Sequence, residues 1–255
     1  MKPNELKALL DETAARYETP TFIADDPISI PHRFTKLQDI EIAALFASTI
    51  AWGNRTAILK SCEHLLEICE NAPYDFIVNS SKRDFSKIRN FYHRTFNGED
   101  AFAFASALRR LYCEEHLQSL ETLFAKTPGG SGTQPSLVER QANFRAEFCK
   151  NLPPRSKKHL GDMQGGSAAK KLNLFLRWMV RSNRCGVDFG LWKTISPAEL
   201  FLPLDVHSAR ISRELGLLTR KSNDAKAVFE VTDVLKTFCP EDPAKYDFAL
   251  FAVDV

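Results

Sequence analysis

The chain has 255 residues, enough for one large domain or two small ones with a hydrophobic core. Its 34 Lys and Arg nearly balance its 32 Asp and Glu, and the net charge of +2 excludes a polybasic protein or an acidic disordered chain. Hydrophobic residues at 44% and charged residues at 26% are ordinary globular values. Nineteen Phe beside 11 Gly favour packed helices over a β-sandwich, which needs many glycine-containing turns.

The first segment, Met1–Glu12, is charged throughout and lacks the apolar core of a signal peptide. The apolar stretches at 42–52 and 172–180 are too short to cross a bilayer. We therefore expect a cytoplasmic protein without a membrane partner. The six Cys are scattered, so we expect reduced thiols and neither a zinc nor an iron–sulfur site.

Apolar residues recur at helical spacing along most of the chain, which predicts an all-α fold. Asp39 is the expected N-cap of the second helix, and Asp205 caps a later helix that ends at Gly216. Val206 is expected to bury one side of that later helix. The predicted helical segments are, in chain order, 4–17, 40–52, 56–69, 73–79, 84–93, 100–114, 117–126, 136–150, 168–182, 206–216, 223–238 and 243–251.

The balanced net charge conceals a basic segment at residues 150–185. This segment contains nine Lys and Arg and a single acid, Asp162, so its net charge is +8 and that of the remaining chain is −6. Binding to a nucleic-acid backbone depends on the number of cations that reach phosphates, and such clustering favours it. A solvated basic surface explains the charge equally simply.

The segment 168–181 reads as a largely buried helix, because it is apolar over most of its circumference. A narrow polar stripe comprises Lys170, Asn173, Arg177 and Arg181, and it places Lys170 on a face that could meet DNA. Lys170 and Lys171 fall in the first helical turn, where the helix dipole favours loss of a proton. A neutral amine is the form that nucleophilic lysine chemistry requires. The alternative is that both lysines simply bind phosphate or water.

A second segment of interest is Leu204-Asp205-Val-His207-Ser-Ala-Arg210, which follows an extended, proline-containing approach. An aspartate N-cap is usually structural. His207 fits a packed or phosphate-facing histidine better than a metal ligand, because no other His or Cys lies beside it at ligand spacing.

Together the two segments resemble the helix-hairpin-helix DNA glycosylase superfamily, which includes endonuclease III and the oxoguanine glycosylases. The stretch Gly166-Ser-Ala-Ala-Lys170-Lys-Leu-Asn173 is similar to the superfamily pattern Gly-x-Gly-x-Lys-Thr-Ala-Asn, which contains the catalytic lysine. The stretch around Asp205 is similar to the pattern (Val/Leu)-Asp-x-His-(x)3-Arg, which supplies the catalytic aspartate. The resemblance selects Lys170 rather than Lys171.

The chain departs from the superfamily pattern in two places. Ala168 replaces the second hairpin glycine, and Lys170 lies 35 residues before Asp205, a spacing more similar to the archaeal oxoguanine-glycosylase branch. More narrowly, the chain resembles a bacterial family of unassigned activity with Lys-Lys-Leu-Asn-x-Phe-Leu-Arg-Trp-Met-Val and Pro-Leu-Asp-x-His motifs.

The resemblance implies a fold of two helical subdomains that flank a cleft. It places a six-helix-barrel-like subdomain at 37–165, a second subdomain at 1–36 plus 186–255, and a hairpin helix at the junction, 166–185.

The resemblance also implies a monomeric base-excision repair enzyme that acts on double-stranded DNA with a damaged base, with an oxidised purine as the first candidate. Lys170 would form a Schiff base with the sugar and act as an AP lyase, Asp205 would assist it, and no metal or organic cofactor would be needed. The implied DNA-binding residues are Lys157, Lys158, Gly166, Lys171, Arg177, His207 and Arg210.

Three other functions stay open. The chain could be a non-catalytic DNA-binding protein on the same scaffold, which would use the basic segment only for phosphates. It could be a phosphoesterase in which Asp205 and His207 help to hold a metal ion. It could also be a helical interaction protein with no role on nucleic acids.

Overall fold

The computed structural model describes residues 2–125 and 135–253. This part of the chain is mostly helical, with one two-stranded sheet, which confirms the predicted helical fold class. Contacts divide the chain into two compact units: a terminal unit, Met1–Ala24 with Gly161–Val255, and a central unit, Asp25–Leu160. The segment 25–36 thus groups with the central unit, and the segment 161–185 groups with the terminal unit. The division into a six-helix-barrel-like subdomain, a second subdomain and a hairpin helix stays a prediction.

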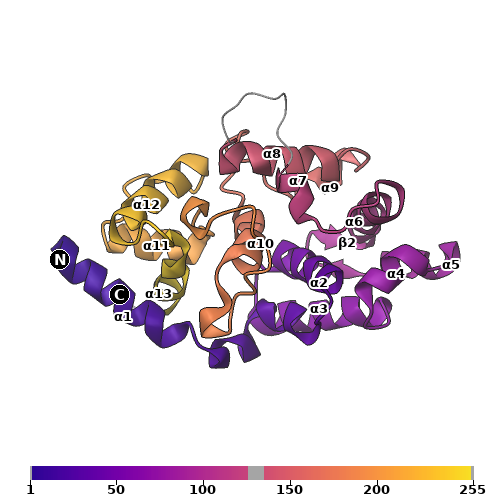
Figure 1. Ribbon diagram of the computed structural model, residues 1–255, viewed down its shortest axis with the longest axis horizontal. Coiled ribbons are helices and arrows are strands. Elements are labelled where there is room, and N and C mark those ends of the chain that lie inside the picture. The colour runs from indigo at the N-terminus through magenta and orange to yellow at the C-terminus, as the bar shows by residue number, and fades with distance from the viewer. Residues whose placement is uncertain (1, 126–134, 254–255) are drawn as a thin grey trace. The chain divides into compact units, whose positions relative to one another are not determined.

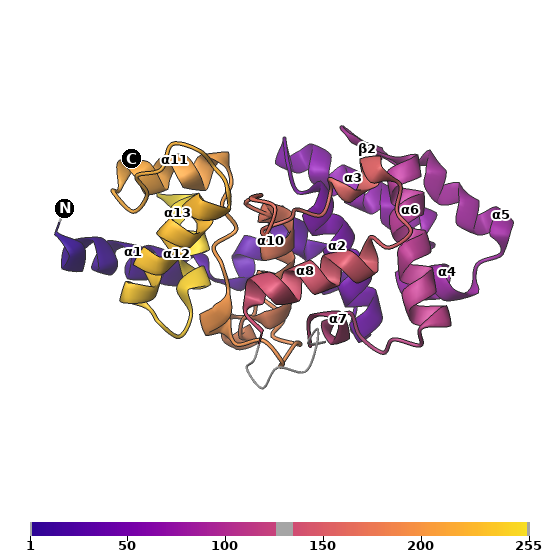
Figure 2. The same ribbon diagram turned by 90° about the horizontal axis from the view of Figure 1, so that it is seen from above.

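The central unit is built on two long helices, α2 (Leu37–Ile50) and α3 (Arg55–Ile68), which pack against each other (Figure 2). Their apolar faces bury against α4 (Pro73–Asn79) and the short 3₁₀ turns that precede α2, and Phe46 of α2 packs against Phe104 of α6 (Gly98–Arg109). The helices and strands of this unit are α2 (Leu37–Ile50), α3 (Arg55–Ile68), α4 (Pro73–Asn79), α5 (Lys82–Phe85), β1 (Tyr92–His93), β2 (Phe96–Asn97), α6 (Gly98–Arg109), α7 (Glu121–Ala125), α8 (Leu137–Phe148) and α9 (Pro154–Lys157).

Most helices of the central unit match the predicted segments, but two expectations are wrong. The predicted helix at 84–93 is instead α5, a 3₁₀ turn and the first strand of a hairpin, which turns at Arg94 with a φ of 55°. Lys36, rather than Asp39, is the N-cap of α2. The Asp39 carboxylate instead accepts a hydrogen bond from the backbone N–H of Tyr74 at 2.8 Å and so joins α2 to α4.

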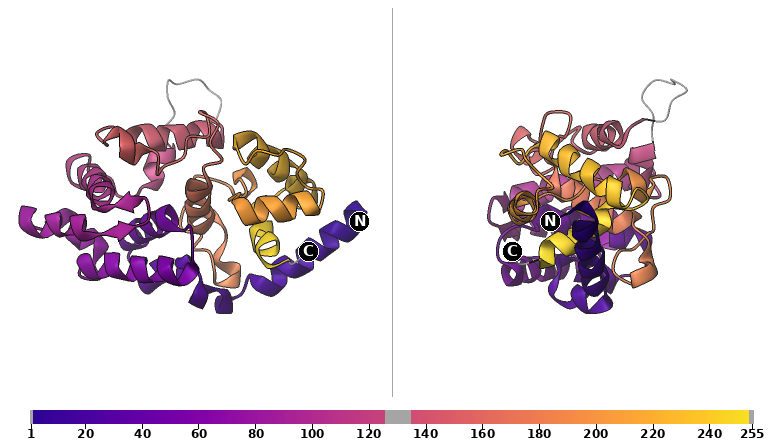
Figure 3. Two further views of the ribbon diagram at one scale, coloured as in Figure 1. Left: turned by 180° about the vertical axis from the view of Figure 1, so that it is seen from behind. Right: turned by 90° about the vertical axis from the view of Figure 1, so that its left-hand side faces the viewer.

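The terminal unit joins the two ends of the chain. Helix α1 (Pro3–Tyr17) packs along α13 (Tyr246–Ala252), as Figures 1 and 3 show. Asp11 of α1 accepts a hydrogen bond from the Tyr246 hydroxyl at 2.8 Å and pairs with Lys245 at 2.8 Å. The other α-helices of this unit are α10 (Lys170–Val180), α11 (Val206–Glu214) and α12 (Ala225–Phe238).

Helix α10 is the core element of the terminal unit, and every residue from Leu172 to Val180 is buried. This confirms the predicted buried helix. The predicted polar stripe is buried as well, because Asn173, Arg177 and Arg181 are each at most 3% exposed. Only the first turn of α10, with Lys170 and Lys171, reaches the surface.

None of the helices in the described parts of the chain is long and apolar enough to span a membrane.

Candidate active site

A tight turn precedes α10 and positions its first residue. Gly166 has a φ of +92°, and the N–H of Gly165 donates to the Asp162 carboxylate at 3.0 Å. The Gly166 carbonyl accepts a hydrogen bond from the N–H of Ala225 at 3.0 Å, which fixes the turn to the start of α12. Gly165 and Gly166 therefore lie in a turn that leads into the N-terminus of α10.

Ala169 lies at the N-cap of α10 in the left-handed region, with φ +44° and ψ 37°. This conformation costs a non-glycine residue on the order of 1–2 kcal/mol. An alanine side chain also has no acceptor with which to cap a helix. The chain thus begins α10 with a strained and weakly capped residue directly before Lys170, and such strain concentrates at functional sites.

Asp205 is the N-cap of α11, as expected. Its carboxylate accepts a hydrogen bond from the N–H of Ser208 at 2.8 Å, and the Ser208 hydroxyl accepts one from the N–H of Asp205 at 2.9 Å. Gly216 follows the end of α11 with a φ of +74°, also as expected. The reciprocal cap fixes the carboxylate of Asp205 on a rigid element.

The structure brings Lys170 and Asp205 together across 35 residues of sequence. The Nζ of Lys170 lies 3.9 Å from Oδ2 of Asp205, and their side chains are 25% and 45% exposed. This distance is longer than a hydrogen bond, so a proton can pass between the amine and the carboxylate through one water molecule or after a small side-chain movement. Both groups are accessible to a substrate and both lie at the start of a helix.

A second carboxylate, Asp247 of α13, belongs to the same group of side chains. It pairs with Arg177 of α10, and its side chain is only 15% exposed. Burial is the largest influence on the pKa of Asp247 and raises it, and the negative charge of Asp205 acts in the same direction. The positive charges of Arg177 and Lys170 lower this pKa. The charges of Lys170 and Asp205 therefore both act on Asp247.

Arg177 is buried, which corrects the prediction that it contacts DNA. Its side chain is 4% exposed, pairs with Asp247, and places Nε 3.4 Å from Oδ1 of the buried Asp188. The guanidinium also lies over the Phe248 ring at 4.5 Å. A side chain held in this way cannot reach a phosphate on the surface.

Arg181 is buried in a comparable network. It pairs with Asp188, with Asp242 at 2.8 Å and with Glu18 at 2.8 Å. Two of the nine basic side chains in the segment 150–185 are thus neutralised inside the protein, and the +8 charge overstates the cationic surface there.

The other predicted DNA-binding residues of the terminal unit are placed as follows. Gly166 is exposed and Lys171 is partly buried at the first turn of α10. Arg210 is exposed and pairs with Glu214 one turn later on α11 at 2.8 Å. The ring of His207 lies 6.3 Å from that of Phe251, and its buried Nε2 has no hydrogen-bond partner among the residues that the structure describes, which favours the packed alternative.

Lys157 and Lys158 lie at the end of α9 in the central unit. The Ser156 hydroxyl beside them donates to the buried Asp100 at 2.7 Å and anchors the helix. Lys158 is exposed and Lys157 partly buried, so both can reach solvent. They belong to a different compact unit from Lys170 and Asp205.

Sequence reasoning missed two features of the site. Asp247 gave no motif signal, although an acid between the fully buried Tyr246 and Phe248 indicates an internal partner. Val206, expected to be buried, is instead 79% exposed and directly follows Asp205. It presents an apolar side chain to solvent beside the candidate catalytic carboxylate.

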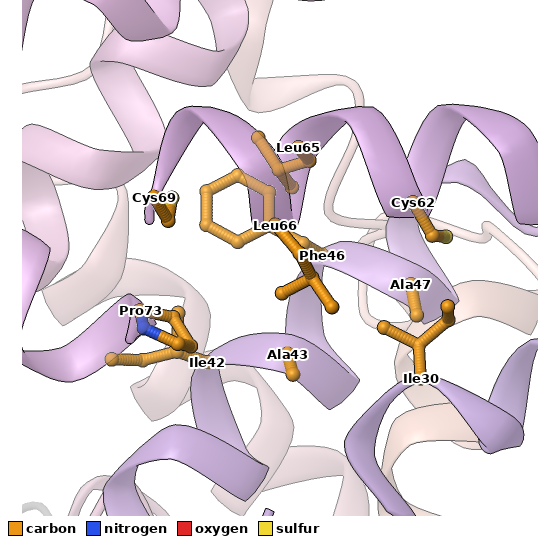
Figure 4. Close-up of a pocket in the computed structure, with 10 residues that line it drawn as sticks. All are labelled: Ile30, Ile42, Ala43, Phe46, Ala47, Cys62, Leu65, Leu66, Cys69 and Pro73. Carbon is orange, nitrogen blue, oxygen red and sulfur yellow. The ribbon is translucent and has the colours of Figure 1, made fainter. Parts of the chain in front are cut away.

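An apolar pocket in the central unit is a less suitable site (Figure 4). Its lining comes mainly from α2 and α3, and the only reactive groups among the residues that line it are the thiols of Cys62 and Cys69. Burial raises the pKa of each thiol to about 12, so both stay protonated and unreactive at neutral pH. Within 2–125 and 135–253, no group of three His, Cys, Asp or Glu is arranged to hold a metal ion.

Comparison with known proteins gave one match. Residues 26–255 match the family described as "Protein of unknown function (DUF2400)". No curated protein and no solved structure matches the chain. Because the match covers nearly the whole sequence, the chain belongs to this family.

Proposed function

We propose that this protein is a DNA base-excision repair glycosylase with AP-lyase activity, in which Lys170 is the nucleophile. The observation that carries the proposal is the 3.9 Å approach of the Lys170 amine to the Asp205 carboxylate, on two helix starts. The resemblance of both segments to the helix-hairpin-helix glycosylases points to the same pair. A two-subdomain scaffold with a DNA-binding cleft is part of this proposal.

In the proposed reaction, the Lys170 nitrogen attacks the sugar C1′ of a damaged nucleotide that has left the base stack. The bond from C1′ to the base breaks, and the base leaves with the electron pair of that bond and takes up a proton. Asp205 stabilises the positive charge on the sugar and accepts the proton that the amine loses. Ring opening gives a Schiff base, and β-elimination then cleaves the strand on the 3′ side.

The exposed residues around the pair suit a DNA substrate. The Gly165–Gly166 turn presents backbone at the surface, Lys171 adds positive charge in the first turn of α10, and Arg210 is exposed in the middle of α11, where it pairs with Glu214. We propose that the turn, Lys171 and Arg210 contact DNA phosphates, as do Lys157 and Lys158 of the central unit. We propose a damaged base, with an oxidised purine as the first candidate, as the leaving group.

The test is borohydride trapping on duplexes that contain an abasic site, 8-oxoguanine or other oxidised bases. We expect a covalent adduct with the native protein and none with Lys170→Gln, because only a Schiff base is reduced to a stable bond. Lys226→Gln is the matched control, since it removes an exposed lysine of α12 that lies outside the proposed DNA contacts and leaves the nucleophile. An equal adduct with Lys170→Gln, or none with native protein on any duplex, contradicts the proposal.

Salt-dependent binding to duplex DNA without an adduct or base release would instead indicate a non-catalytic DNA-binding protein. Failure to bind duplex DNA at low salt would contradict both the glycosylase proposal and the non-catalytic DNA-binding alternative.

A further inference from the structure

A second cationic segment lies in the central unit, outside the candidate active site. Residues 82–94 contain five Lys and Arg and one acid, so their net charge is +4 with His neutral. All five basic side chains are exposed, and two of them, Lys87 and Arg89, have acidic partners. The segment ends with Arg94 at the tip of the β1–β2 hairpin. The −6 charge of the chain outside 150–185 therefore conceals this segment.

Arg94 has a left-handed backbone conformation at the hairpin tip, with a φ of 55°. His93 pairs with Phe96 in the sheet, so Arg94 and Thr95 alone make the turn. Two-residue hairpin turns favour Gly or Asn where φ is positive, because a Cβ atom crowds the backbone carbonyl in that conformation. Arginine is less favourable here than either residue, and strain of this kind concentrates at functional sites.

The guanidinium of Arg94 is held between two neighbouring residues. Its carbon atom lies 4.3 Å from the centre of the Trp52 ring, which is a cation–π distance. Gly53 has a φ of +108°, and a Cβ atom built on it would lie 2.2 Å from a guanidinium nitrogen of Arg94. Glycine therefore leaves the space that the arginine fills. Trp52 and Gly53 lie between α2 and α3, so the hairpin tip covers the junction of these helices.

His93 fixes the hairpin to the same junction. It is 4% exposed, and its Nδ1 lies 2.8 Å from the Ser61 hydroxyl of α3. Its Nε2 lies 3.4 Å from the backbone carbonyl oxygen of Trp52, and the two rings pack edge to face with their centroids 6.3 Å apart. The strand that carries Arg94 is thus tied both to α3 and to the residue on which the guanidinium stacks, so the cation is preorganised.

The Arg94 guanidinium is exposed, and it forms no ion pair or hydrogen bond with any residue that the structure describes. Stacking uses one face of a guanidinium and leaves the N–H groups in its plane for acceptors. This fork of donors matches two oxygens of a phosphate or a carboxylate. The four other exposed cations of residues 82–94 favour a ligand with many closely spaced negative charges, and a nucleic-acid backbone is such a ligand.

We propose that Trp52, Gly53 and Arg94 form a phosphate-binding site, the Arg94 site, which takes a phosphodiester of a DNA backbone. The choice of DNA as the ligand rests on the proposed function, whereas the site itself does not use Lys170 or Asp205. Trp52 and Gly53 fix the guanidinium in place before binding, so less side-chain freedom is lost when the phosphate arrives. The strained turn is retained because Gly or Asn there would supply no cation.

The experiment measures binding of the full chain to an undamaged, fluorescein-labelled duplex by fluorescence anisotropy between 50 and 200 mM NaCl. Arg94→Asn removes the guanidinium and suits the turn, because Asn tolerates a positive φ. Gly53→Ala keeps every charge, but its Cβ atom displaces the guanidinium. Arg83→Gln is the matched control, because Arg83 is an exposed cation of the same segment on α5.

We expect Arg94→Asn to weaken duplex binding about tenfold at 50 mM NaCl. The slope of log Kd against log salt should fall by about one, because one phosphate contact is lost. Gly53→Ala should lose a comparable amount of affinity, and Arg83→Gln should stay within about twofold of the native protein because its charge acts only through screening solvent. Where Gly53→Ala does not fold, Trp52→Leu removes the stacking partner and should give the same loss.

Urea unfolding separates a binding role of Arg94 from a structural one. Arg94→Asn should not lower the urea midpoint, because Asn suits the turn better than Arg. A lower midpoint with native duplex binding would show a structural role and overturn the proposal. A loss of affinity in Arg94→Asn no larger than that in Arg83→Gln overturns it as well. Polyglutamate that displaces the duplex as effectively as unlabelled DNA would identify a carboxylate ligand and would also overturn it.

The outcomes also separate the Arg94 site from the proposed function. Binding that depends on Arg94 without a borohydride adduct would reject the glycosylase activity and leave the Arg94 site intact. An adduct together with native affinity in Arg94→Asn would reject the Arg94 site alone. A native protein that does not bind the duplex at 50 mM NaCl would overturn both.

Discussion

Replacing Arg177 with Met should strongly destabilise the terminal unit. The side chain of Arg177 is 4% exposed and neutralises two acids, the fully buried Asp188 and Asp247. Removing one partner of a buried ion pair typically costs about 3–5 kcal/mol, because the remaining charge stays buried without compensation. Arg181 still pairs with Asp188 in the variant, which places the expected loss near 3 kcal/mol, at the lower end of that range. Met conserves the aliphatic stem, so lost packing adds little.

The measurement is urea unfolding followed by tryptophan fluorescence. Of the three Trp, two are buried in the terminal unit, Trp178 and Trp192, and Trp52 belongs to the central unit. A Trp52→Phe background therefore restricts the signal to the terminal unit. Arg210→Met is the control: its exposed pair with Glu214 contributes only about 0.3–0.5 kcal/mol.

A double variant tests the electrostatic cause. Adding Asp247→Asn to Arg177→Met removes one of the uncompensated charges. The double variant should therefore lose less unfolding free energy than the sum of the losses in the two single variants. The reasoning is refuted if Arg177→Met costs no more than Arg210→Met, or if the two substitutions are additive.

Three further predictions follow from the structure. Asp205→Asn should slow base release but keep the stability of α11, because Asn is an equally good N-cap. Asp205→Ala should in addition lower the free energy of unfolding in urea by about 1 kcal/mol, because Ala cannot cap the helix. Base release at the native rate in Asp205→Asn would reject the catalytic role. Burial raises the pKa of Asp11, but hydrogen bonds from Lys245, Lys7 and Tyr246 outweigh it and lower the pKa from 3.8 to about 2. The ionised Asp11 therefore stabilises the fold fully above about pH 4, and this contribution is lost as the pH falls toward 2. Asp11→Asn should reduce the difference in urea midpoint between pH 5 and pH 2.5, and an unchanged difference would contradict this. Iodoacetamide at pH 8 should alkylate the exposed Cys185 before the buried Cys62 and Cys69, as peptide mass spectrometry can show; equal rates would mean that the α2–α3 core opens freely.

Hydrophobic periodicity was sufficient to predict most helices, because an apolar stripe at a spacing of three to four residues needs a partner surface whatever the fold. It failed at 84–93. Phe85, Ile88 and Phe91 are three residues apart, which suits a 3₁₀ turn as well as an α-helix. The rings of Phe91 and Phe96 then pack edge to face across the hairpin with their centroids 6.0 Å apart, a contact that the local sequence pattern cannot reveal.

The candidate site was predictable only in part. The two motifs point to Lys170 and Asp205, and the capping chemistry of Asp205 can be read from its own neighbourhood. The burial of Arg177 could not be read in this way, since its partners Asp188 and Asp247 lie 11 and 70 residues further along the chain. Charge counted along a segment treats every Arg as exposed, whereas folding paired this one with acids from the negatively charged remainder.

The location of the covalent bond tests the central claim most directly. After borohydride trapping on a duplex with an abasic site, proteolysis and tandem mass spectrometry identify the lysine that carries the reduced deoxyribose remnant. We predict that the modified residue is Lys170, the amine that lies 3.9 Å from Asp205. A remnant on Lys171 or on a lysine elsewhere in the chain would contradict the assignment, and a protein without any remnant would contradict the Schiff-base chemistry itself.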